Sequence, residues 1–267
     1  MFLSEMRNTV VPLILLSLRA FTHFPEMEKI PAMTAEIHTL PARLADCLKL
    51  CYLLRERGEP MTAQAVRELL EASEPTGRLS GSVVTHAFEQ LQARGYVAYT
   101  PYYGVELTMT GEAASAELVR HYRLLKLFLA RVLKVSLDQV NAEAERLEHV
   151  LSEVVEERMD ALLGHPTEDP HGDPIPDEHG RVQVAPAIRL PAAVVGQLVA
   201  LQRIMTQDPA LLRYLEQLGL VPGVEMCLEA RTPYGDVLTL RVGDARFPLG
   251  AAVADHLLVR VITQRQQ

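Results

Sequence analysis

Residues 80–108 decide the fold of the first half of the chain, and they read SGSVVTHAFEQLQARGYVAYTPYYGVELT. Apolar side chains recur at helical spacing as far as Arg94, and Gly95 then supplies a stop. The apolar face of this predicted helix comprises Val84, Ala87, Phe88 and Leu91. The residues that follow predict two short strands, 96–100 and 105–108, joined by a turn of hairpin composition. The stretch therefore indicates a helix followed by a two-stranded hairpin.

The residues before this stretch predict two further helices. An apolar stripe runs from Leu44 to Arg57, where Gly58 supplies a stop. A second helix begins at Thr62, because threonine is an effective N-cap, and the breaker-rich turn 74–77 separates it from the third. Three short helices and a hairpin are the arrangement of a winged helix-turn-helix, whose third helix enters the major groove of DNA.

The remainder of the chain predicts more helix and then a small β domain. Helical patterns cover 112–132 and 140–163, and the prolines and glycines of 164–176 end regular structure. From 188 to 262 the pattern changes to short β-rich runs, which predict a small SH3-like barrel. The candidate strands are 224–229, 237–242 and 257–262.

The helix predicted over 140–163 carries an apolar face and an acidic cluster. One face of this helix should pack against the core or a second subunit, and the residues that share it are Val140, Ala144, Leu147, Leu151, Val154 and Arg158. Glu145, Glu148 and His149 lie at i, i+3 and i+4, so their side chains emerge together. Carboxylates gathered in this way repel one another unless a cation lies between them, which favours a divalent metal site. The alternative is a solvated helix surface, because the pattern alone has low specificity.

Composition indicates an ordinary globular protein of more than one domain. The chain has 267 residues, of which 48% are hydrophobic and 22% charged. Its net charge of −8 excludes a protein that coats nucleic acid indiscriminately, but it leaves open one local DNA-binding surface. The longest early apolar run is too short to cross a bilayer, so we expect no membrane partner. Residues 1–36 are expected to form an N-terminal arm, poorly ordered or preceding a start at Met33, and a signal peptide is the less favoured interpretation.

The three cysteines, Cys47, Cys51 and Cys227, are too few for a disulfide framework. Their number fits a reducing, cytoplasmic location. Cys47 and Cys51 fall at i, i+4 within an apolar pattern, so buried packing is a better interpretation than metal ligation.

Two stretches resemble the signature of the diphtheria toxin repressor family of metalloregulators. They read EAERLEHV at 143–150 and HPTEDPHGDPIP at 165–176, and the resemblance extends from about residue 40 to the C-terminus. It implies a mainly α fold with small β parts: a winged helix-turn-helix, a helical dimerisation domain and an SH3-like β-barrel. The implied parts are an arm at 1–36, the DNA-binding domain at 37–109, the helical metal-binding and dimerisation domain at 110–176, a linker at 177–187 and the SH3-like (FeoA-like) domain at 188–267.

The resemblance also implies which residues bind metal. The principal site falls on Asp46, Glu145, Glu148 and His149, and the oxygen donors at 46 and 145 resemble the manganese-responsive branch of the family. Oxygen donors favour a hard ion, so manganese(II) is the expected cofactor, with iron(II) as the other candidate. The family's second metal site matches poorly, and we expect it to be absent or rebuilt, because its positions fall on Tyr122, Lys126, Asn141 and Lys49. Asp208 is expected to be a helix-end residue before Pro209 rather than a metal ligand.

The function implied by the resemblance is that of a manganese-responsive transcriptional regulator. We expect a homodimeric repressor of metal-uptake genes that binds a palindromic double-stranded operator and is not an enzyme. The implied DNA-binding residues are Arg78, Ser80, Ser82, Thr85 and His86. Three alternatives stay open: an iron- or zinc-responsive repressor, a metal-dependent hydrolase, and a DNA-binding scaffold without a metal response.

Overall fold

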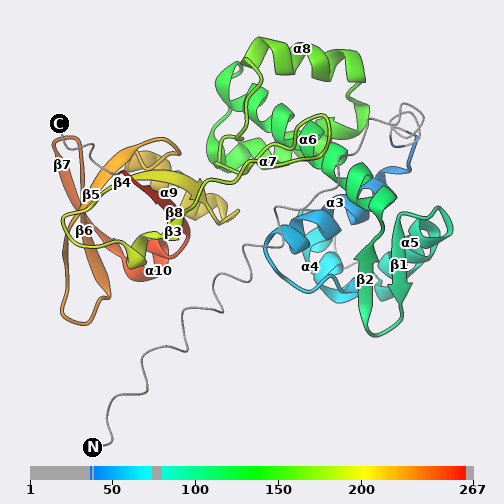
Figure 1. Cartoon of the computed structure of the whole chain (residues 1–267), viewed down its shortest axis with the longest axis horizontal. Coiled ribbons are helices and arrows are strands. Elements are labelled where there is room, and N and C mark those ends of the chain that lie inside the picture. Colours follow the sequence, from blue (N-terminus) through cyan, green and yellow to red (C-terminus); the bar gives the residue numbers. More distant parts are fainter. Residues whose placement is uncertain (1–36, 38, 74–79, 263–267) are drawn as a thin grey trace, which may run out of the picture. The chain divides into compact units, whose positions relative to one another are not determined.

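The computed structural model describes residue 37 and residues 39–73 and 80–262 (Figure 1). The predicted arm, the turn 74–77 and Arg78 lie outside these residues. The chain forms two compact units. One extends to Leu118 and includes Glu178–Arg181, and the other comprises Val119–Asp177 and the residues from Val182 onward. The division falls within one helix, and each unit has a hydrophobic core of its own.

The first unit contains the predicted helix-turn-helix and wing. Its elements are α3 (Ala42–Glu56), α4 (Ala63–Ser73), α5 (Gly81–Ala93), β1 (Val97–Thr100), β2 (Gly104–Leu107) and the first part of α6 (Met109–Arg131). The strands pair antiparallel, with Val97 opposite Leu107 and Thr100 opposite Gly104. The predicted helices and hairpin are therefore confirmed, and Figure 1 shows the β1–β2 ribbon beside α5.

The core of this unit is formed mainly by α3 and α5. Cys47, Leu48 and Cys51 of α3 are fully buried with Phe88 and Leu91 of α5. Burial raises the pKa of both α3 thiols, that of Cys47 to about 12. The two cysteines are thus neutral packing groups, as their spacing suggested.

Two local contacts set the ends of elements in this unit. Thr62 Oγ1 accepts a hydrogen bond from Ala65 N at 3.1 Å, so Thr62 caps α4, as predicted. Val105 N donates to Met61 O at 2.9 Å, which ties the wing to the loop before α4. At Gly104, φ is +128° and an added Cβ would lie 2.8 Å from Met61 O, so glycine is required here.

The helical part of the second unit departs from the sequence prediction. It contains the rest of α6, then α7 (Leu137–Leu147), the 3₁₀ turn η2 (Glu148–Val150) and α8 (Glu153–Leu163). The single helix predicted over 140–163 is wrong, because Leu151 and Ser152 adopt extended backbone. Serine favours an N-cap, and the acidic residues of the next turn suit a helix N-terminus, so a new helix begins at Glu153.

This break also changes the predicted apolar face. Val140 and Ala144 are fully buried, but Leu147 and Val154 are 41% and 65% exposed. Leu151 of the predicted face is half-buried against the same core, and Met159 of α8 is buried in it. The predicted face is therefore interrupted, with Leu147 and Val154 on the surface of this chain.

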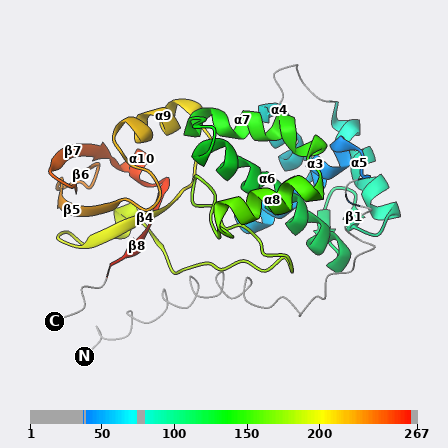
Figure 2. The same ribbon diagram turned by 90° about the horizontal axis from the view of Figure 1, so that it is seen from above.

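The second unit continues into the predicted β domain. Its strands are β3 (Ile188–Arg189), β4 (Leu198–Ile204), β5 (Glu225–Arg231), β6 (Val237–Val242), β7 (Ala245–Gly250) and β8 (Leu257–Val261). They form one antiparallel sheet in the order β3-β8-β4-β5-β6-β7. Figure 2 shows this sheet with α9 (Pro209–Gln217) and α10 (Ala251–Ala254), and η3 (Leu190–Ala192) follows β3.

The core of the β domain lies between the sheet and α9. Leu212 and Leu215 of α9 are fully buried together with Leu201, Leu228 and Leu240 of the strands. The sequence prediction missed the helices α9 and α10 and the strands β3, β4 and β7. No helix among the described residues is long and apolar enough to cross a membrane.

Candidate metal centre and nucleic-acid interface

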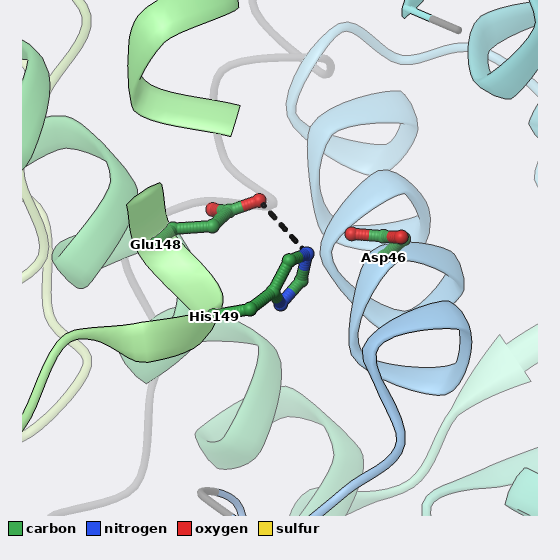
Figure 3. Close-up of side chains that lie close together, drawn as sticks. All are labelled: Asp46, Glu148 and His149. Atoms are coloured by element: carbon green, nitrogen blue, oxygen red, sulfur yellow. Dashed lines mark ion pairs between the residues drawn. The ribbon is translucent and has the colours of Figure 1, made fainter. Parts of the chain in front are cut away.

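Two of the predicted ligands lie side by side on η2. His149 Nε2 is 3.7 Å from Glu148 Oε1, and the side chains are 31% and 7% exposed (Figure 3). Adjacent residues of a 3₁₀ turn point about 120° apart, so the carboxylate and the ring approach each other through their side-chain conformations and not by sharing one face of the helix. The result is a carboxylate and an imidazole that meet near the surface of the second unit.

Glu145 lies on the last turn of α7 and is half-buried. Its charge and that of Glu148 act on the same buried group, the hydroxyl of Tyr122. Burial raises the pKa of Tyr122 well above its usual value, and the two carboxylates are the next largest causes. Glu145 and Glu148 therefore contribute to one negative field, which is an environment that favours a bound cation.

The fourth predicted ligand belongs to the first unit. Asp46 lies on α3, is half-buried and is drawn on its helix in Figure 3. Its negative charge adds to burial in raising the pKa of the neighbouring Cys47, while Arg43 acts in the opposite direction. One turn later, Lys49 is 2% exposed, so this second-site position carries a buried ammonium.

The donor atoms of these residues suit a hard divalent ion. Asp46, Glu148 and His149 each offer one ligand atom, either a carboxylate oxygen or an imidazole nitrogen. Carboxylate oxygens favour magnesium, calcium and manganese, and imidazole extends the range to iron and zinc. The residues present thus fit a manganese or iron ion by their chemistry.

The residues at the family's second-site positions do not fit a metal. Tyr122 donates a hydrogen bond from its hydroxyl to Asn141 Oδ1 at 3.3 Å. Lys126 is 2% exposed and forms an ion pair with Asp169. Asp208 accepts a hydrogen bond from Ala210 N at 2.8 Å and caps α9, as expected of a helix-end residue.

The predicted DNA-reading residues lie along α5. Ser80 is its N-cap residue, and its hydroxyl lies 2.7 Å from that of Ser82. His86 is 70% exposed and lies 3.4 Å from a carboxylate oxygen of Glu89, while Thr85 is half-buried. Exposed hydroxyls at a helix N-terminus, beside unsatisfied backbone N–H groups, are suited to phosphate oxygens.

The wing adds an aromatic tip to the same unit. Tyr102 and Tyr103 are 104% and 87% exposed, and Tyr102 has a φ of +69°. Tyr103 N donates to Thr100 O at 3.1 Å, which closes the turn.

Two parts of the chain match described protein families. Residues 108–177 match "Iron dependent repressor, metal binding and dimerisation domain", and residues 188–261 match the FeoA domain. These ranges cover the helical and β parts of the second unit, together with the start of α6.

The chain is similar to characterised repressors over most of its length. The iron-dependent repressor IdeR of Mycobacterium tuberculosis is 30% identical over 230 residues, covering 80% of this chain and 95% of that protein. A solved manganese-dependent transcriptional repressor in complex with manganese has 30% identity and a TM-score of 0.71, covering 82% of this chain and 100% of that one. The manganese regulator SloR has 28% identity and a TM-score of 0.61, covering 82% of this chain and 98% of its own.

Proposed function

We propose that this chain, which belongs to the diphtheria toxin repressor family of metal-dependent transcriptional repressors, responds to manganese(II) bound by Asp46, Glu145, Glu148 and His149. The observation that carries this proposal is the pairing of Glu148 with His149 on η2, next to the half-buried Glu145. This set is rich in oxygen and holds no sulfur, which favours manganese over softer ions. The resemblance to repressors named for manganese supports the same choice.

The mechanism that we propose uses the metal as a link between two parts of the chain. Asp46 lies on α3, in the DNA-binding part of the chain formed by the helix-turn-helix and the wing, which we call the reading head. It precedes the other ligands by about a hundred residues. An ion bound by all four would fix the orientation of the reading head, so that two recognition helices match successive major grooves. A switch from 1% to 99% of the competent form requires about 5.5 kcal/mol of preferential metal binding.

The operator-bound form in this proposal is a homodimer. Apolar side chains that are exposed on this chain gather on η2 and α8, where Val150, Val154 and Leu162 are 80%, 65% and 67% exposed. Burial of such side chains stabilises an interface between two copies. A symmetric dimer explains a palindromic operator. We expect the protein to act in the cytoplasm, and its expected targets are genes for metal uptake.

The test of the metal link is the variant Asp46→Ala. A DNA sequence is first selected from a random pool by the manganese-loaded protein, and its binding is then titrated with manganese. The variant should lose the manganese-dependent gain in affinity, whereas Asp244→Ala, which removes an exposed aspartate in a turn, should keep it. Equal gains in both variants would contradict the proposed link.

The identity of the metal is tested in the same assay. Manganese(II), iron(II) and zinc(II) are titrated at buffered free concentrations, and manganese is expected to activate DNA binding within its physiological range. Activation by iron alone would favour the alternative suggested by the iron-dependent relatives. DNA binding that a chelator leaves unchanged would indicate a scaffold without a metal response, and turnover of a phosphoester substrate would indicate a hydrolase.

A further inference from the structure

A lysine lies at the centre of a buried polar cluster in the second unit. The ammonium of Lys126 on α6 is 2.5 Å from Asp169 Oδ2 and 3.8 Å from Asp173 Oδ2. It also lies 5.0 Å from the ring centre of Tyr122, one turn earlier on α6. Lys126 and Asp169 are both almost fully buried. A buried ammonium is stable only when it is paired in this way, so the cluster depends on both partners.

The carboxylates of this cluster organise the proline-rich loop that carries them. Asp169 Oδ1 accepts hydrogen bonds from His171 N at 2.8 Å and Asp173 N at 3.0 Å. Gly172, between them, has a φ of +82°, and an added Cβ would lie 1.8 Å from Gln202 O. The loop is therefore folded tightly around one carboxylate and pressed against β4.

The same loop is fastened to both parts of the second unit. On the helical side, Arg123 Nη1 donates to Pro174 O at 2.6 Å, beside the pairing of Asp169 with Lys126. On the sheet side, Asp173 forms an ion pair with Arg203, and Ile204 N donates to His171 O at 2.8 Å. The loop thus joins α6 to β4, and its acidic residues face cations from both.

The carboxylates of this cluster are already paired with cations of the chain itself. Burial opposes the ionisation of Asp173, but Arg203, Arg123 and Lys126 outweigh it and hold its pKa below the usual range. Lys126 also occupies a position that the sequence resemblance assigns to a carboxylate ligand of a second metal. This position therefore differs from the family pattern in charge, because it carries the ammonium of Lys126 in place of a carboxylate.

We propose that the Lys126 ammonium replaces a second metal ion. This ammonium pairs with Asp169, joins Arg203 in offsetting the charge of Asp173, and holds the loop 169–174 between α6 and β4. The SH3-like domain is then docked on the helical part without metal, and each subunit binds one regulatory ion. The stoichiometry rests on the proposed manganese site, but the metal-independent docking does not.

The docking is tested by hydrogen–deuterium exchange of the full chain, in excess chelator and in excess manganese. The amides of 169–174 and of β4 should show the same protection in both conditions. Loop protection that is present only with metal would overturn the proposal, whatever the outcome at the other site.

Three variants then test the lysine itself. Lys126→Met keeps the length of the side chain and removes its charge, so exchange of the loop amides should rise about tenfold or more. Lys126→Arg should retain protection, and Lys134→Met, which removes an exposed ammonium, should match the unmodified chain. Unchanged loop exchange in Lys126→Met would contradict the proposed role.

Manganese binding separates this proposal from the proposed function. One ion per subunit is expected by calorimetry, and Asp46→Ala should weaken its binding without altering loop protection. Two ions per subunit, the second lost in Asp169→Asn, would overturn the replacement of metal by lysine. Absence of manganese binding together with a metal-independent loop would contradict the proposed function and leave the docking supported.

Discussion

The buried histidine of the proline-rich loop should make the second unit sensitive to acid. His171 is 2% exposed, and its Nε2 lies 3.2 Å from the carbonyl oxygen of Leu137. The neutral ring therefore carries its proton on Nε2 and donates it to this carbonyl. A second proton would have to be placed on Nδ1 inside the protein. Burial, and next the charge of Lys126, lower the pKa of His171 to about 4, although Asp169 and Asp173 oppose this.

The size and sign of the effect follow from this value. The usual histidine pKa is 6.5, so as the pH falls the unfolded chain takes up the proton before the folded chain does. The contribution of His171 to stability is complete above pH 6.5 and is lost as the pH falls towards 4. Over the whole range the loss is about 3 kcal/mol, and most of it has occurred by about pH 4.5.

The assay is urea unfolding of the full chain in chelator, followed by circular dichroism at several pH values. The matched variant is His171→Gln, whose side-chain amide can donate to the same carbonyl but does not titrate. Between pH 7 and about 4.5 the unmodified chain should lose about 2 kcal/mol more stability than the variant. Equal losses in the two proteins would refute the assignment of acid sensitivity to His171.

Three further substitutions have outcomes that the structure specifies. Thr62→Ala removes the cap of α4 and should lower the free energy of unfolding by about 1 kcal/mol, measured by urea titration. Gly104→Ala places a methyl group against Met61 O at a backbone angle unsuited to alanine and should cost about 2–4 kcal/mol by the same measurement. Val154→Asp should weaken the proposed dimer in sedimentation experiments, whereas Val194→Asp, which changes a valine of similar exposure on the SH3-like domain, should not.

The reading head could be predicted from the sequence because its signals are local. The stops at Gly58 and Gly95 and the cap at Thr62 lie next to the elements that they end or begin. The break at Ser152 was missed because the apolar pattern continues across it, and only the serine followed by acidic residues marks the start of α8. Helix α9 had a comparable signal in Asp208, a cap immediately before a proline, which the prediction treated as an isolated helix end.

The candidate metal site could be predicted only in part from its own spacing. Glu148 and His149 are adjacent in the sequence, and the structure pairs them. Asp46 lies too far along the chain for any periodicity to connect it with them, so only the resemblance to a family identified it. The pairing of Lys126 with Asp169 has no sequence signal, because a helix and a distant loop meet there through tertiary packing.

The most direct test of the proposed metal link is a crystal structure of the manganese-loaded protein, with anomalous data collected on both sides of the manganese absorption edge. We expect one anomalous peak per subunit, coordinated by oxygen atoms of Asp46, Glu145 and Glu148 and by a ring nitrogen of His149. A peak that lies away from Asp46, or loaded crystals in which no ion joins Asp46 to η2, would contradict the proposal that the metal sets the reading head in place.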